Sequence, residues 1–450
     1  MRTVGKGTMR FPRHLLWGLE KENLRLDPDG RLSDSPHPRE LGLPRYSRDF
    51  AESQLETITP PATSAAEALA GMADLSDRAE AAIRPERLWN YSMPPAGIEE
   101  GDIRIAEFVA NPDPAMRPAA REREVLYREG LALRYGKSRQ LISGVHLNFS
   151  VPGDSLEDLR GEAGRGFASE AEFRNEFYTA LAGYLYRKLP VLLLFSAATP
   201  FVPPAPGLFP EGRPALSLRN GGGGYAGTAY RPYLNLDSFR SYLGKIREGT
   251  ETISDIYHFL GTVTKGKATQ LNAAVFQQAK EFYAPLRIRC GKSHADPPSA
   301  EYLELRIFDI NPFEESGIEA GIIDLVQLYA TAWIAGPEYR SWLDSPYRYM
   351  ERNTALLPGA LAAFDAVSAL DPEDGDRTGL SGRWEAEKRE LRPAAEALDR
   401  DGGGRYGRGL ETLTARLNGA GGLTAERVIR AFREDETFLR TSGSRLRAAV

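Results

Sequence analysis

The chain has 450 residues, a net charge of −5 and an isoelectric point near 5.8, so it offers no basic face for a nucleic-acid partner. Its single cysteine, Cys290, excludes a disulfide framework and a cysteine-based zinc site. Residues 1–10 contain no apolar signal core, and the longest apolar run, Leu189–Ala198, is too short to cross a bilayer. We therefore expect a cytoplasmic protein with no membrane contact.

The first strong pattern lies at Leu16–Leu26, which alternates as a strand does and places Glu20 and Glu22 on one face. The two carboxylates lie in an otherwise apolar run, which indicates partial burial. A buried pair of like charges needs shifted pKa values, cationic partners or a divalent metal, and Mg²⁺ prefers oxygen ligands of this kind. Two solvated glutamates at a strand edge explain this stretch alone equally well.

The next two elements are a second acidic strand and a helix. Arg48–Pro60 favours a strand that carries Glu52 and Glu56 on one face, because Thr57, Ile58 and Thr59 prefer strands. A capping box that starts at Ser64 then begins a helix that we expect to reach about residue 83.

An aromatic loop and a second helix follow. We expect a loop over Leu88–Pro95 and a helix over about Pro118–Tyr135, which Gly136 ends. Tyr127 and Leu131 are four residues apart, so they share one face of that helix.

The clearest strand pattern of the chain is Leu141–Ser150. Its apolar residues fall on one face, and His146 and Asn148 fall on the other. A long helix is expected from about Glu170 to Leu189. The polar face of this strand therefore adds an imidazole and an amide to the candidate site.

A Pro- and Gly-rich loop, Pro203–Gly227, occupies the middle of the chain and contains four consecutive glycines beside Arg219. Loops of this length are usually functional or disordered, and a flexible spacer fits the composition as well as a binding loop does. We expect two helices over Leu236–Val263 and a short strand that ends at Cys290.

A third acidic strand is expected over Glu301–Pro312, with Glu304, Arg306 and Phe308 on one face. A carboxylate and a guanidinium side by side suit phosphate and metal binding, although a cross-strand salt bridge would use the same residues. An apolar helix from about Gly317 to Ala335 and a helical remainder then pack around the sheet.

These acidic strands and the strand of His146 would meet at one cleft if they form one antiparallel sheet. The cleft would collect Glu20, Glu22, Asp49, Glu52 or Glu56, His146, Glu304 and Arg306. So many oxygen ligands suit two or three Mg²⁺ ions that bridge a nucleotide polyphosphate, whereas a single imidazole argues against zinc. The sequence has no P-loop, and a glycosidase would need only two of these carboxylates.

Nine sequence blocks in order resemble the glutamate–cysteine ligase (γ-glutamylcysteine synthetase) family of bacterial type. They are G-L-E-K-E-N-L-R at 18–25, H-P-R-E-L-G at 37–42, D-F-A-E-S-Q-L-E-T-I-T-P at 49–60, S-M-P at 92–94, L-Y-R-E-G-L at 126–131, I-S-G-V-H-L-N-F-S at 142–150, S-L-R-N-G-G-G-G-Y at 217–225, Y-A-P-L-R at 283–287 and E-Y-L-E-L-R-I-F-D-I-N-P-F at 301–313. Each block alone is weak, but nine in family order are highly specific.

The resemblance implies an α+β fold like that of glutamine synthetase, in which a curved antiparallel sheet forms a funnel with helices outside. It implies one catalytic domain over residues 1–450, mainly helical from about residue 317. ATP would phosphorylate the γ-carboxylate of glutamate and the amine of cysteine would attack the acyl phosphate, the first step of glutathione synthesis. Mg²⁺, with Mn²⁺ as an alternative, would be the ion. We expect a monomer with small-molecule substrates only.

The resemblance also assigns roles by position. The family's metal ligands match Glu20, Glu22, Asp49, Glu56, His146 and Glu304. Arg306 matches the arginine that contacts the γ-phosphate, and with Glu304 it is the predicted catalytic pair. The acceptor pocket matches Phe50, Tyr127, Leu131, Gln140, Arg219, Tyr225 and Tyr283. Glu52 has less support as a ligand.

The four glycines between Arg219 and Tyr225 replace a family segment with fewer glycines. This departure leaves open a ligase that joins glutamate to a different amine. A catalytically silent binding protein of the same fold is a third possibility, and the retention of every acidic position weighs against it.

Overall fold

The computed structural model describes residues 12–95, 97–106, 118–164, 166–200, 286–290, 299–344, 378–401 and 403–434. The strands are β1 (Leu16–Leu26), β2 (Tyr46–Arg48), β3 (Gln54–Ile58), β4 (Arg87–Trp89), β5 (Val145–Ser150), β6 (Leu286–Cys290) and β7 (Ala300–Phe308). The helices are α1 (Ala65–Ala82), α2 (Pro118–Tyr135), α3 (Gly153–Ala163), α4 (Glu170–Tyr186), α5 (Leu189–Ser196), α10 (Ala320–Ala335), α11 (Pro337–Asp344), α14 (Thr378–Leu398), α15 (Arg405–Leu417) and α16 (Thr424–Glu434), with 3₁₀ turns η1 (Glu100–Asp102), η2 (Ser138–Leu141) and η4 (Asp399–Asp401).

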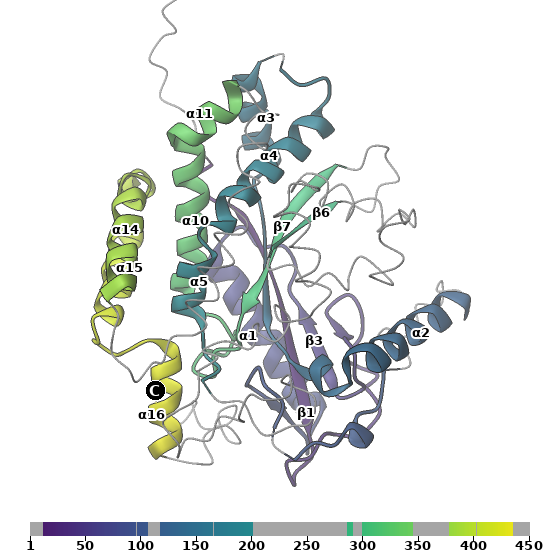
Figure 1. Ribbon diagram of the computed structural model, residues 1–450. Helices are drawn as coiled ribbons and strands as arrows, with labels where there is room; N and C mark the ends of the chain where they lie inside the picture. The colour runs from purple at the N-terminus through teal and green to yellow at the C-terminus, as the bar shows by residue number, and fades with distance from the viewer. Residues whose placement is uncertain are drawn as a thin grey trace, which may run out of the picture.

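The seven strands of the described residues form one antiparallel sheet in the order β2-β3-β1-β5-β7-β6, and β4 also pairs with β1 (Figure 1). The register places Glu20 of β1 opposite His146 of β5, and Glu22 opposite Glu56 of β3. Strands distant in sequence are therefore neighbours in space. The predicted α+β architecture, an antiparallel sheet with surrounding helices, is confirmed.

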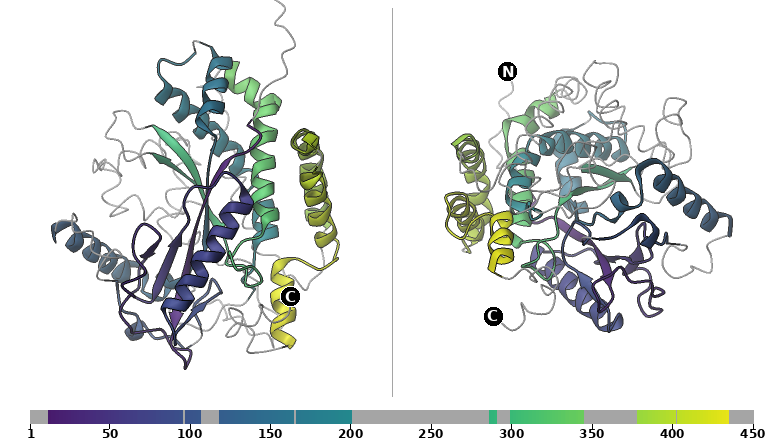
Figure 2. Two further views of the ribbon diagram at one scale, coloured as in Figure 1. Left: turned by 180° about the vertical axis from the view of Figure 1, so that it is seen from behind. Right: turned by 60° about the horizontal axis from the view of Figure 1, so that its bottom comes forward.

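One face of the sheet is covered by α1, α4, α5 and α10, and α14 and α15 pack outside α10 (Figures 1 and 2). Leu19, Leu147 and Leu305 form an apolar row across β1, β5 and β7 beneath these helices, and each is at most 1% exposed. Complete burial of a leucine stabilises the fold by about 1.5–3 kcal/mol. A slip by one residue would move this row to the other face, so the core fixes the register and thereby the polar face.

The opposite face of the sheet carries the polar residues and, at one end, a second apolar cluster that involves α2 and α16. Leu24 and Leu26 of β1 belong to this cluster, together with residues of α2 and of the segment after β2. The apolar cluster and the polar residues therefore lie side by side on the same face of the sheet. None of the described helices combines the length and hydropathy that a bilayer crossing would require.

Several predicted elements have the expected bounds. β1 spans the predicted residues, α2 spans the predicted 118–135, and α1 begins after Ser64, whose side chain accepts a hydrogen bond from Glu67 N at 3.1 Å. The predicted helices over 236–263 and the loop over 203–227 lie outside the described residues.

Three expectations were wrong in detail. The predicted strand over 48–60 is divided into β2 and β3, with residues 49–53 as the connection, and the predicted loop over 88–95 begins with β4. Phe308 lies in the helix-covered core together with Ile307, not on the face of Glu304. The β5–β7 register shifts between Val145 and Leu147, and this irregularity interrupts the simple alternation that the sequence suggested.

Candidate active site

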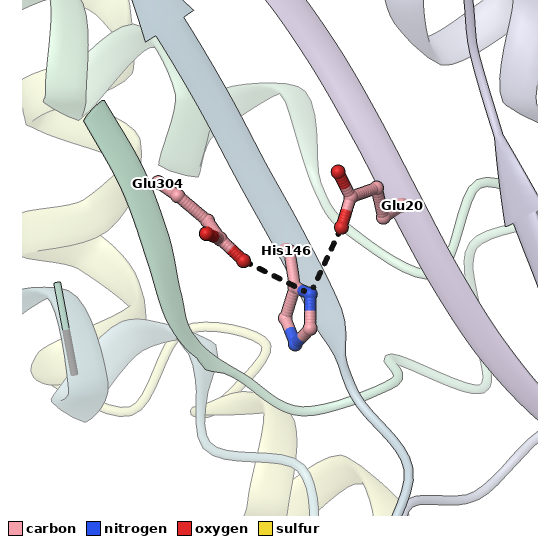
Figure 3. A group of neighbouring side chains, drawn as sticks. All are labelled: Glu20, His146 and Glu304. Carbon is pink, nitrogen blue, oxygen red and sulfur yellow. Dashed lines mark hydrogen bonds and ion pairs between the residues drawn. The ribbon is translucent and has the colours of Figure 1, made fainter. Parts of the chain in front are cut away.

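Three neighbouring strands bring together the central group of the predicted site. Glu20 of β1, His146 of β5 and Glu304 of β7 point toward one another on the polar face (Figure 3). His146 Nδ1 lies 3.2 Å from Glu20 Oε2 and 3.5 Å from Glu304 Oε1. One ligand atom from each residue lies within 4.8 Å of the other two, so the group is compact enough to share an ion.

Glu304 is fully buried and lies between two arginines. Its Oε1 is 2.5 Å from Arg306 Nη1, and its Oε2 is 2.7 Å from Arg289 Nε. Burial alone would raise the pKa of Glu304, but Arg306, Arg289 and Arg287 outweigh it and hold the pKa below its usual range. The carboxylate is therefore ionised at neutral pH.

Glu20 and His146 are joined by a hydrogen bond across β1 and β5. Burial raises the pKa of Glu20, but its hydrogen bond with His146 opposes this effect and the net shift is downward. Asn148 Nδ2 also donates to Glu20 Oε1 at 2.9 Å. Burial and then the charge of Arg306 lower the pKa of His146, so the imidazole is neutral at pH 7 and can present a lone pair.

A second acidic group lies toward β3. Glu22 and Glu56 are opposite each other across β1 and β3, and Glu22 Oε1 is 3.8 Å from His146 Nε2. Burial, Asp49 and Glu56 raise the pKa of Glu22 well above its usual value. Burial, Glu20 and Asp49 raise the pKa of Glu56 to about 8. Asp49, on the connection that follows β2, thus contributes to the raised pKa values of both Glu22 and Glu56.

Glu52 has a separate role from the six predicted metal ligands. Its carboxylate forms a buried ion pair with Arg48 and accepts a hydrogen bond from His37 N at 3.1 Å.

The apolar residues of the predicted acceptor pocket come from two segments. Phe50, Tyr127 and Leu131 are buried in one apolar cluster on the polar side of the sheet. Gln140 is buried on η2, beside Leu141 of the same cluster. The remaining predicted pocket residues, Arg219, Tyr225 and Tyr283, lie outside the described residues.

The sequence predictions did not include two arginines of β6 that affect the site. Arg287 lies opposite Glu304 in the β6–β7 ladder, and Arg289 contacts the carboxylate of Glu304. The alternating R-I-R of 287–289 is a signal for two cations on one strand face, but their partner becomes evident only from the pairing with β7.

Comparison with known proteins identifies the family. The sequence model described as Glutamate-cysteine ligase matches residues 6–341. The chain belongs to the glutamate–cysteine ligase family. A glutamate–cysteine ligase from Clostridium acetobutylicum is 30% identical over 93% of this chain and 92% of its own length. Another from Pseudomonas paraeruginosa is 32% identical over 86% of this chain and 73% of its own length.

Two solved structures share the fold. A glutamate–cysteine ligase from Francisella tularensis, described in complex with AMP, has a TM-score of 0.68 at 22% identity and covers 97% of this chain and 89% of its own. A bifunctional glutathione synthetase from Pasteurella multocida has a TM-score of 0.69 at 23% identity, over 97% of this chain and 52% of its own. Residues 6–341, the part that matches the family, include every predicted site residue. The helices α14–α16 follow it.

Proposed function

We propose that this ligase joins the γ-carboxylate of glutamate to the amine of cysteine and uses ATP as the phosphate donor. The names of the relatives support these substrates, and the Francisella tularensis structure with AMP supports a nucleotide site. The observation that carries the proposal is the convergence of Glu20, His146 and Glu304 from three strands onto one small space.

The donor set fits Mg²⁺. Five carboxylates and one neutral imidazole present mainly oxygen ligands, which Mg²⁺ and Mn²⁺ prefer, and too few nitrogen or sulfur ligands for a zinc site. The residues that would hold the ions are Glu20, Glu22, Asp49, Glu56, His146 and Glu304. Bound there, the ions would offset the negative charge of the nucleotide phosphates.

The residues of the chain supply positioning and charge for two successive transfers. A γ-carboxylate oxygen of glutamate attacks the γ-phosphorus of ATP, which releases ADP and leaves an acyl phosphate. The amine of the acceptor then attacks the acyl carbon, phosphate departs, and the amine gives up a proton as the amide forms. Arg306, which contacts Glu304 and His146, would stabilise the transferring phosphoryl group.

The acceptor is expected to lie against the apolar cluster of Phe50, Tyr127 and Leu131, where a small thiol side chain would contact rings and methyl groups instead of water. The acidic group and this cluster lie on the same face of the sheet, as a reaction between the acyl phosphate and the amine requires. We infer further that the enzyme acts as a monomer and as one catalytic domain.

The test is ADP release from ATP and glutamate with a panel of amino-acid acceptors. Cysteine is expected to give the highest kcat/KM. A higher value with another amine would reject cysteine as the acceptor and favour the different γ-glutamyl ligase. Absence of ADP release with every acceptor, in the presence of Mg²⁺ or Mn²⁺, would reject the ligase function itself.

A further inference from the structure

The connection between β2 and β3, residues 49–53, carries both a proposed metal ligand and a proposed pocket residue. Asp49 is solvent-exposed, whereas the next side chain, Phe50, is 2% exposed within the apolar cluster. Phe50 N donates to Gln54 Oε1 at 3.2 Å, and Phe50 O accepts from Ala106 N at 2.9 Å. The backbone of this connection is thus held at Phe50, the residue whose side chain enters the apolar cluster.

One buried side chain on α2 binds this connection to the helix. Arg128 is 7% exposed, and its Nε donates to Asp49 O at 2.7 Å. Its Nη1 donates to Ala106 O at 3.1 Å, and its Nη2 donates to Arg48 O at 3.5 Å. The planar guanidinium thus links three backbone carbonyls from two segments, each through a different nitrogen of its rigid fork of N–H groups.

Arg128 lies on α2 next to two residues of the proposed acceptor pocket. Its neighbour in the chain is Tyr127, and Leu131 follows three residues later on the same helix. Phe50 is the pocket residue contributed by the connection, and all three apolar side chains lie in one cluster. The guanidinium group of Arg128 therefore links α2, which carries Tyr127 and Leu131, to the connection that carries Phe50.

We propose that Arg128 is a positioning residue that sets the distance between the two sides of the acceptor pocket. This inference rests on the proposed function, since it concerns the pocket for the amine. Arg128 itself contacts backbone carbonyls and takes no part in the bond changes. Its loss should weaken the use of the acceptor more than the binding of ATP.

Three variants test this role. Arg128→Lys keeps a positive charge but has one nitrogen in place of the three that contact carbonyls, and Arg128→Met keeps most of the length without the charge. Both are expected to raise the KM for cysteine about tenfold or more and to change the KM for ATP less than about twofold, because a shift of Phe50 away from Tyr127 and Leu131 would loosen the contacts of the bound acceptor. In Arg128→Ala, added ethylguanidinium is expected to lower the KM for cysteine again.

Arg174→Met is the matched control. Arg174 lies on α4, on the helix-covered side of the sheet, and its Nε likewise donates to a backbone carbonyl, Ala300 O, at 2.9 Å. Its substitution should leave both KM values unchanged. Arg128→Lys serves as the decisive variant if Arg128→Met does not fold.

The outcomes separate this inference from the proposed function. An active native enzyme whose Arg128→Lys variant keeps the native KM for cysteine, or loses only thermal stability, would overturn the positioning role alone. A native protein that releases no ADP with any amine would reject the proposed function and this inference with it. A selective rise in the KM for cysteine, reversed by ethylguanidinium in Arg128→Ala, would support both.

Discussion

Two isosteric substitutions in the acidic group should change the stability of the metal-free protein in opposite directions. Glu56→Gln is expected to stabilise the fold, and Glu304→Gln is expected to destabilise it. Both replace an ionisable carboxyl group on the same face of the sheet by an amide. The difference arises from the partners of each carboxylate.

Glu56 lowers stability at neutral pH because burial, Glu20 and Asp49 raise its pKa from 4.5 to about 8. An acid with a raised folded-state pKa imposes no cost below pH 4.5, and the cost grows until the pH exceeds about 8. At pH 7 this shift corresponds to about 3 kcal/mol, which is the upper bound for the gain in Glu56→Gln.

Glu304 has the opposite balance because its carboxylate contacts Arg289 and Arg306 and is fully buried. Glutamine would leave both guanidinium groups without their counter-charge. Removal of one partner from a buried ion pair costs about 3–5 kcal/mol, and the partial exposure of Arg289 favours the lower end of that range.

The assay is urea unfolding at pH 7 in the presence of EDTA, followed by circular dichroism. Glu385→Gln, a change at an exposed residue of α14, is the control and should alter the free energy of unfolding by less than about 0.5 kcal/mol. A loss of stability in Glu56→Gln, or a gain in Glu304→Gln, would refute this account of charge compensation.

Four other outcomes are expected. Glu20→Gln should abolish ADP formation and the thermal stabilisation by Mg²⁺ while the circular dichroism spectrum stays native. Tyr127→Ala should raise the KM for cysteine and leave that for ATP unchanged, as initial rates would show. The contribution of Glu56 makes the unfolding free energy of the metal-free native protein decline between about pH 5 and 8, and unfolding at several pH values should show a smaller decline in Glu56→Gln. Lys188→Met removes the contacts of Lys188 Nζ with Glu387 and Glu390 of α14, at 2.7 and 2.6 Å, and should lower the free energy of unfolding by about 3–5 kcal/mol. If the chain is a single domain, the variant should still unfold in one transition.

The sequence was sufficient to predict the strands that carry the central carboxylates. β1 is one continuous strand from Leu16 to Leu26, so the period of two alone places Glu20 and Glu22 on one face, although burial alternates only as far as Lys21. The assumption of one antiparallel sheet predicts that Glu20, His146 and Glu304 lie close together. The observed register agrees with this prediction.

The positioning contacts could not be predicted in the same way. Arg128 donates its hydrogen bonds to backbone carbonyls. Every residue has such a carbonyl, so the side chains of the partner segments give no sequence signal for these contacts. The core placement of Phe308 depends on a shift of register between two strands that are more than 150 residues apart in sequence, which single-strand alternation does not reveal.

Charge compensation divides the acidic face into two parts with different chemical character. Glu20 and Glu304 lie among protein cations and hydrogen-bond donors, so their pKa values are lowered. Glu22 and Glu56 lie toward Asp49 and have raised pKa values, because they are buried and because nearby carboxylates add negative charge that the described cations do not offset. An added divalent cation would therefore relieve more repulsion beside Glu22 and Glu56 than beside Glu304. An ion bound beside Glu22 and Glu56 should therefore stabilise the pairing of β1 with β3, the two strands that carry these glutamates. The free energy of unfolding of the sheet should then depend on the concentration of the ion.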